Sequence, residues 1–129
     1  MFTVTQLILH AVGDYVLQSD WMANEKTKRS LPCLVHVLFY TALFITVTQS
    51  PLALAVIGGS HFLIDRFRLA KYICYAKNFL APRSHWYPWK KCAATGYSED
   101  RPAWLAVWLL IITDNLLHVT INALAVTYF

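Results

Sequence analysis

Charge is what this chain largely lacks. Charged side chains make up 14% of its 129 residues and hydrophobic residues 57%, and the mean hydropathy is +0.44. All eleven Lys and Arg residues lie in two stretches, 26–29 and 66–101, and residues 31–64 carry no charge. This pattern favours a membrane protein over a very apolar soluble helical bundle. It also argues against nucleic acid as a partner, because the basic residues are few and all of them are expected to lie at the membrane surface.

Motifs for several common chemistries are also missing. Only four glycines are present, and none belongs to a Walker loop or a dinucleotide-binding fingerprint. The three cysteines show no CxxC spacing, so the sequence favours neither a zinc knuckle nor a disulfide framework. No basic region precedes the first apolar segment, and we therefore expect no cleavable signal peptide.

Four apolar runs dominate what is present. They cover about residues 2–18, 31–48, 51–66 and 103–128, and the third can continue to residue 73 as an amphipathic extension. A membrane-spanning helix needs about 20 mostly apolar residues, and a chain this short cannot close a membrane barrel. We therefore predict an all-α fold, an integral membrane four-helix bundle formed by residues 1–129 as a single domain. Residues 74–102 are predicted to form an amphipathic loop at the membrane surface.

Basic residues predict the orientation of this bundle. Both basic stretches fall on one side of an even-numbered bundle, and the opposite connection, TQSPL, has none. The positive-inside rule then predicts a multi-pass protein of a bacterial inner membrane, with cytoplasmic basic loops and periplasmic termini. Aromatic and basic residues mix in RSHWYPWKK, which is typical of contact with lipid head groups. Membrane lipids are therefore the expected partners, and a homo-oligomer is left open.

Ionisable residues inside the apolar runs are the unusual feature of the sequence. Three of the seven acidic residues lie in or at the edge of these runs, and each has a histidine four residues away. The pairs are His10 with Asp14, His61 with Asp65, and Asp114 with His118, and His36 stands alone in the second run. Residues four apart share a helix face. In the predicted topology, the pairs would stack as a histidine layer over an aspartate layer.

Carboxylates and imidazoles inside a membrane usually mark a functional site. His nitrogen and Asp oxygen are common ligands of zinc and of catalytic two-metal clusters. We therefore predict a divalent metal site with two ions, zinc being favoured over manganese or iron. The predicted ligands are His10, Asp14, His36, His61, Asp65, Asp114 and His118. Residues on the same faces that can orient them are Gln18, Asn115 and Asn122. A proton or ion relay and purely structural polar packing are the alternatives.

Several segments carry a resemblance to a known family. HAVGDYVLQSDWMA at 10–23, LVHVLFY around His36, HFLIDRFRLAKY at 61–72 and RPAWLAVWLLIITDNLLHVTIN at 101–122 follow the order HxxxDYxLQ, H, HxxxD, DNxxH. The chain resembles a family of small four-helix membrane proteins of unknown function from bacteria and their phages. Its His/Asp pattern is similar to that of inner-membrane proteins described as metal-dependent hydrolases, and more distantly to helical zinc phospholipases and nucleases. That similarity implies that the seven His and Asp residues are ligands.

These features together predict a membrane-embedded, metal-dependent hydrolase of a phosphoester such as a phospholipid or a lipid-linked phosphate. Metal-bound water would be the nucleophile, with Asp65 as a candidate base. Candidates to hold an anionic head group are Arg66, Arg68 and Arg83. Two other functions stay open. One is a phage-type effector that binds a host membrane or defence protein through its cytoplasmic loop, and the other is an ion or proton conductor that uses the His/Asp ladder.

Overall fold

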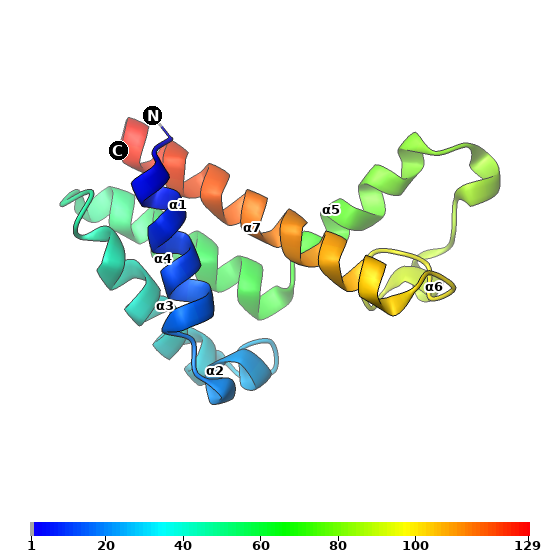
Figure 1. Cartoon of the computed structure of the whole chain (residues 1–129), viewed down its shortest axis with the longest axis horizontal. Helices are drawn as coiled ribbons and strands as arrows, with labels where there is room; N and C mark the ends of the chain where they lie inside the picture. The colour runs from blue at the N-terminus through cyan, green and yellow to red at the C-terminus, as the bar shows by residue number, and fades with distance from the viewer. Residues whose placement is uncertain (1) are drawn as a thin grey trace. The chain divides into compact units, whose positions relative to one another are not determined.

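The structure, a computed structural model, describes residues 2–129 and contains no strand among them. The predicted all-α fold is therefore confirmed. The chain divides into two compact units. The first contains the residues up to Arg68 together with His118–Phe129, and the second is Leu69–Leu117. The longest helix, α7 (Ala103–Tyr128), contributes its first part to the second unit and its last part to the first (Figure 1).

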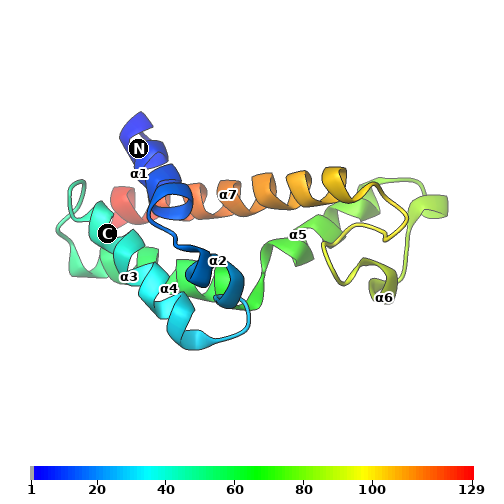
Figure 2. The same ribbon diagram turned by 60° about the horizontal axis from the view of Figure 1, so that its bottom comes forward.

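The first unit is a small helical bundle. Its helices are α1 (Val4–Ala11), a π-helical turn η1 (Val12–Val16), α2 (Asp20–Glu25), α3 (Ser30–Phe44), α4 (Pro51–Phe67) and the end of α7. Helices α3 and α4 pack side by side, and α1 and η1 pack on α3 (Figure 2). Three chain segments are thereby brought together around one interior.

Local capping explains where these helices begin. Thr3 and Gln6 form a reciprocal capping box at α1, with backbone-to-side-chain distances of 3.3 Å in both directions. The Ser19 hydroxyl accepts from the backbone of α2, and Ser50 does the same for α4, whose first residue is Pro51. Such caps satisfy N–H groups that have no partner within the helix.

The helices of the first unit are shorter than the apolar runs. The run at 2–18 becomes α1 followed by η1, and α3 ends at Phe44 rather than near residue 48. The third predicted helix does not continue to residue 73, because Arg68 adopts a left-handed conformation with φ of 52°. A left-handed residue terminates a helix, and the chain starts again as α5 (Ala70–Lys77).

Only α7, with 26 residues, is long and apolar enough to cross a bilayer among the described helices. Helix α3 is apolar but has 15 residues, and α4 has 17. These lengths correspond to about 22 Å and 25 Å of helix, against a hydrocarbon core of about 30 Å. One candidate span at the C-terminal end is therefore found in place of the predicted four.

A small apolar core fills one end of the first unit. It consists of Tyr40, Phe44, Ile57 and Ala125, all at most 1% exposed. Helices α3 and α4 approach closely beside it, because a Cβ atom added to Gly58 would lie 2.7 Å from Thr41 Oγ1. Tyr40 also faces the polar interior described below, and so it joins the core to the candidate site.

The second unit orders the segment that the sequence predicted as an interfacial loop. It contains α5, the 3₁₀ turns η2 (Asn78–Leu80) and η3 (Arg83–His85), α6 (Trp89–Cys92) and the first part of α7. The Tyr72 and Trp89 rings stack with centroids 5.1 Å apart. The Asn78 amide donates to the Gly96 carbonyl at 2.7 Å. These contacts tie the loop to α5.

Candidate metal centre

Four buried ionisable side chains meet inside the first unit. Asp14 comes from η1, His36 from α3, and His61 and Asp65 from successive turns of α4. Each is at most 7% exposed. Such groups are rarely buried unless other groups compensate for the lost water. Their partners therefore decide what the cluster can do.

One donor atom from each residue faces the other three. The two imidazole Nε2 atoms of His36 and His61 are 3.0 Å apart. His36 Nε2 lies 3.3 Å from Asp14 Oδ1 and 3.3 Å from Asp65 Oδ2. His61 Nε2 lies 3.3 Å from the same Asp14 oxygen and 3.2 Å from the same Asp65 oxygen. Five of the six distances among these four atoms are thus 3.0–3.3 Å.

This spacing is that of a tetrahedral metal site. Zinc bonds of about 2.0–2.1 Å at tetrahedral angles separate neighbouring ligand atoms by about 3.3–3.4 Å. Two imidazole nitrogens and two carboxylate oxygens are also donors that zinc accepts. With neutral imidazoles, the two carboxylates supply two negative charges, which one divalent cation would balance.

Protons alone satisfy this arrangement poorly. A ring nitrogen carries at most one proton, yet each Nε2 faces three other potential ligand atoms. Asp14 Oδ1 is buried and accepts no hydrogen bond among the described residues, and His61 Nδ1 also lacks a partner there. A cation between the four atoms would satisfy the Asp14 oxygen and both Nε2 lone pairs at once.

The π-helical turn directs Asp14 toward the cluster. Its wider hydrogen bond joins Leu17 N to Val12 O at 2.9 Å. Such turns recur at functional sites because they re-aim a side chain. The neighbouring Gly13 leaves room for the Tyr40 ring, since an added Cβ would lie only 3.1 Å from Tyr40 Cε2 and closer still to Cδ2. A glycine in this position therefore allows η1 to approach α3.

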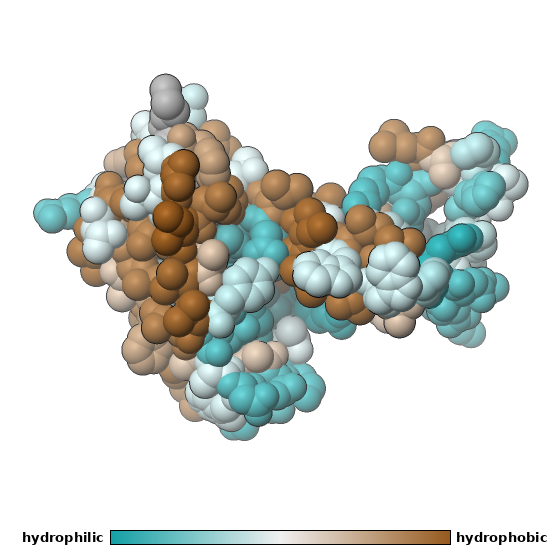
Figure 3. Space-filling view, viewed as in Figure 1, coloured by the Kyte–Doolittle hydropathy of each residue, from teal (hydrophilic) through white to brown (hydrophobic). Residues whose placement is uncertain are grey.

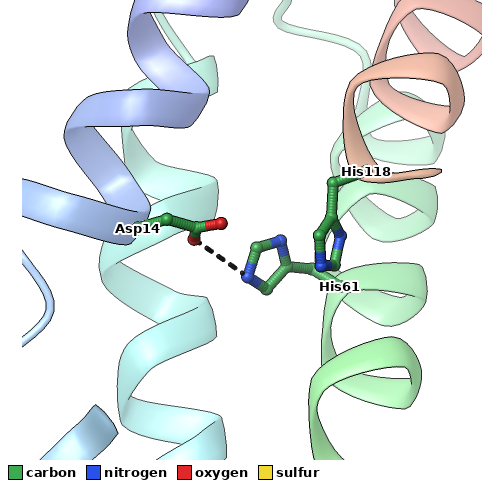
Figure 4. A group of neighbouring side chains, drawn as sticks. All are labelled: Asp14, His61 and His118. Carbon is green, nitrogen blue, oxygen red and sulfur yellow. Dashed lines mark ion pairs between the residues drawn. The ribbon is translucent and has the colours of Figure 1, made fainter. Parts of the chain in front are cut away.

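A third imidazole contacts the other oxygen of Asp65. His118 Nε2, from α7, lies 3.2 Å from Asp65 Oδ1, and its ring stacks on His61 with centroids 4.0 Å apart. Figure 4 shows Asp14 pointing toward one side of the His61 ring while His118 lies on the other side. The ligand atoms of Asp14, His61 and His118 can all be chosen within 4.8 Å of one another. Both oxygens of Asp65 thus face imidazole nitrogens.

Tyr40 holds the histidine rings in place. Its ring lies 3.8 Å from that of His61 between centroids, so His61 is packed between Tyr40 and His118. Its hydroxyl is 2.8 Å from His10 Nδ1 and accepts a hydrogen bond from Asn122 Nδ2 at 2.6 Å. His10 Nδ1 lies 3.6 Å from Asp14 Oδ2, which exceeds hydrogen-bonding distance. In this geometry His10 and Asn122 both contact the Tyr40 hydroxyl, and whether His10 binds metal stays a prediction.

Lys26 is a member of the cluster that sequence reasoning missed. Its Nζ lies 2.7 Å from Asp65 Oδ2, and its side chain is 16% exposed. The sequence showed Lys26 only as part of a basic loop, because contact with Asp65 requires the turn between α2 and α3 to fold over α4. The position of Tyr40, four residues after His36, indicated that the two share a helix face. Its contact with His61 could not be predicted, because it depends on how α3 packs against α4.

The other predicted residues occupy varied positions. Gln18 Nε2 donates to the Asp14 backbone carbonyl at 3.1 Å, and Arg66 Nη1 donates to the Thr27 carbonyl at 2.8 Å. Arg68 is the left-handed residue that ends α4. The remaining three, Asp114, Asn115 and Arg83, belong to the second unit. Donor atoms of Asp14, His36, His61 and Asp65 surround one point, and the stacking of a histidine layer over an aspartate layer stays a prediction.

The exterior of the first unit contrasts with its interior. Buried polar or charged residues there are Gln6, His10, Asp14, His36, His61, Asp65, His118 and Asn122. Large apolar side chains are exposed on the same helices, among them Val16 at 71% and Leu38 at 61%. The face drawn in Figure 3 shows hydrophobic surface over these helices. Exposed apolar surface around an ionisable interior reverses the arrangement of a soluble domain.

Comparison with known families places the chain. The profile of a family described as "Protein of unknown function (DUF3307)" matches residues 2–129. The chain belongs to this family. No curated protein and no solved structure matches it. The resemblance to a family of unknown function is thus confirmed, and the DUF3307 match includes every residue of the cluster. The DUF3307 description assigns no activity, so the chemistry has to be argued from the site.

Proposed function

We propose that this protein is a membrane-embedded, metal-dependent hydrolase of a phosphoester, with a phospholipid or a lipid-linked phosphate as substrate. The observation that carries the proposal is the set of four buried donor atoms spaced at 3.0–3.3 Å. Their chemistry and spacing fit a first divalent ion, held by Asp14, His36, His61 and Asp65. Zinc is the favoured metal, because two nitrogen and two oxygen donors in a tetrahedron suit it.

The position of the Asp65 carboxylate, which would bridge two ions, supports a second ion. Its Oδ2 faces the first ion's ligands, while its Oδ1 lies 3.2 Å from His118 Nε2. A carboxylate that bridges two ions in this way is a common feature of two-metal sites, whose ions lie about 3.5–4 Å apart. Asp14, His36, His61 and Asp65 would hold the first ion with four protein ligands, whereas the described residues would supply few ligands to the second. Open positions for water and substrate therefore belong to the second ion.

The proposed chemistry follows from such a pair. Bound divalent ions lower the pKa of a coordinated water and stabilise the charge that develops on a phosphoryl group. Lys26 adds a positive charge at Asp65 and is the most exposed ionisable member of the cluster. An anionic substrate would find this ammonium group at the edge of the site. A phosphoester therefore fits the local charge better than a neutral substrate does.

The membrane setting is supported by α7 and by the apolar exterior of the first unit. We propose that the remaining helices also lie in the bilayer, although α3 and α4 are short for a full span. Short helices can be accommodated by local thinning of the bilayer or by polar ends that reach the interface. A lipid substrate could then reach the cluster laterally.

The decisive experiment is elemental mass spectrometry on protein purified in detergent without metal-affinity resin. We expect about two zinc, manganese or iron ions per chain. Asp65→Asn and His61→Ala should lose the metal and the hydrolysis of added phosphoesters while still inserting into the membrane. Matched controls are Asp20→Asn and His85→Ala, since both residues are exposed and outside the cluster. Both controls should keep the wild-type metal content.

Three outcomes would overturn the proposal. Folded, active wild-type protein that contains no metal would remove its basis. Metal-free protein that carries current in a planar bilayer would favour the conductor instead. Retained metal in Asp65→Asn and His61→Ala would show that the ions bind elsewhere.

A further inference from the structure

A second candidate binding site lies wholly within the second unit. It is a pocket of about 240 Å³ whose lining includes Tyr97, Arg101, Leu105, Ala106 and Leu109. Sites for drug-sized ligands usually have volumes of about 300–1,000 Å³. This pocket therefore suits a small polar group with a short apolar extension rather than a large ligand.

Two of the residues that line the pocket, Tyr97 and Arg101, have unused hydrogen-bonding capacity. The Tyr97 hydroxyl is buried and has no hydrogen-bond partner among the described residues. Burial also raises the pKa of this phenol, so it stays a proton donor. Arg101 donates from Nη2 to the Tyr87 hydroxyl at 3.1 Å and lies over the same ring at 5.9 Å. These contacts hold the guanidinium and leave its other N–H groups available.

The balance of charges in the second unit favours an anionic ligand. Its basic residues are Lys71, Lys77, Arg83, Lys90, Lys91 and Arg101. None of these six cations belongs to an ion pair found among the described residues, and they outnumber the unit's three carboxylates, those of Glu99, Asp100 and Asp114. A guanidinium outside any ion pair found among the described residues, in a pocket that Tyr97 also lines, is suited to a phosphate.

The rest of the pocket is apolar and ordered along α7. Arg101 precedes this helix, and Leu105 and Leu109 follow at spacings of four residues, so that they share one face. The lining therefore changes from cationic to apolar in one direction. Trp104 and Trp108 on the same helix are 68% and 60% exposed, and exposed Trp is typical of the membrane interface.

We propose that this pocket binds one anionic phospholipid, with its phosphate at Arg101 and the Tyr97 hydroxyl and the start of an acyl chain along Leu105 and Leu109. The lipid is a bound component of the protein and occupies a site separate from the metal cluster. This inference rests on the membrane setting proposed above and not on the metal chemistry.

Native mass spectrometry of the full chain from maltoside micelles can test this inference. Added phosphatidylglycerol should be retained as one tightly bound molecule per chain, about tenfold tighter than phosphatidylcholine. Arg101→Gln should weaken phosphatidylglycerol binding about tenfold, the effect of losing one charge-assisted contact. Tyr97→Phe should weaken it several-fold. Lys90→Gln is the matched control, because it removes the same charge from an exposed residue outside the pocket, and it should change binding less than twofold.

Several results would overturn the proposal. Equal losses in Arg101→Gln and Lys90→Gln would show general surface attraction, and no loss in either would show that the pocket does not bind lipid. If inorganic phosphate at the same concentration as the lipid displaced the lipid completely, the pocket would be a simple phosphate site. If Arg101→Gln fails to fold, Arg101→Lys serves instead and should show an intermediate loss. Metal content should be unchanged in every variant, so failure here is distinct from failure of the hydrolase proposal.

Discussion

Gly13→Ala should damage the candidate metal centre although no ligand is changed. The added Cβ would lie 3.1 Å from Tyr40 Cε2 and 3.3 Å from Cγ, and closer still to Cδ2. Carbon atoms normally pack about 3.5–4.0 Å apart, so the ring or η1 must shift by about 1 Å. Tyr40 is completely buried. The ring cannot move outward without disturbing its neighbours.

The expected cost can be worked from the contacts of Tyr40. Its ring packs on His61 at 3.8 Å, and its hydroxyl contacts His10 at 2.8 Å and Asn122 at 2.6 Å. Overpacking of a buried site costs about 1–3 kcal/mol. Replacing glycine by alanine in an unobstructed helix instead gains about 1 kcal/mol. With this gain subtracted from the steric cost, Gly13→Ala should lower the stability by up to about 2 kcal/mol.

Gly59→Ala provides a control of opposite sign. Gly59 lies inside α4, two residues before His61, and an added Cβ there would meet nothing within 4 Å. Thermal denaturation in detergent should therefore show a lower midpoint for Gly13→Ala and an unchanged or higher one for Gly59→Ala, by about 3–6 °C per kcal/mol. Metal content should fall only in Gly13→Ala. A Gly13→Ala protein with wild-type stability and metal would refute the packing of η1 against Tyr40.

Two further predictions concern charge and burial. Lys26→Met removes the ammonium group that lies 2.7 Å from Asp65 Oδ2. Because this ammonium group would repel a metal cation strongly in a partly buried site, the variant should bind metal at least about tenfold more tightly in a chelator competition. Weaker metal retention in the variant would mean that Lys26 supports the ion through Asp65. Cys92 is 1% exposed, and burial raises the pKa of its thiol, which lowers the thiolate fraction at a given pH. Iodoacetamide at pH 8 should therefore label Cys92 at least about tenfold more slowly in folded than in denatured protein, as measured by peptide mass spectrometry. Equal labelling rates in the two states would contradict the packing of the second unit.

Helical structure and polar interior residues could be predicted because both depend on patterns along the chain. Apolar runs interrupted by few charges indicated helices, and α7 covers the run at 103–128. Histidine and aspartate in such runs indicated an ionisable interior, and His61 and Asp65 do face each other within α4 at 3.2 Å. Spacing within one helix is a local property, so it can be seen without the fold.

Breaks in the helices were less visible. The left-handed Arg68 ends α4 inside the predicted amphipathic extension, which contains no Gly or Pro, the usual signals of such a break. The π-helical turn at Val12–Val16 also lacks a local signature. Both features depend on packing against other segments, which overrides local preference.

Patterns along the chain predicted that this protein is helical, with long apolar runs that contain histidine and aspartate, which are rare in lipid-facing segments. Which of these residues meet at one centre depends on how the helices pack. Asp14 Oδ1 faces His36 and His61 while its Oδ2 lies 3.6 Å from His10, His118 contacts Asp65, and Lys26 joins them from a distant loop. The physical reason is that helix periodicity determines neighbours within one helix, whereas ligand geometry depends on how separate helices approach. That approach is set by close contacts such as Gly13 against Tyr40.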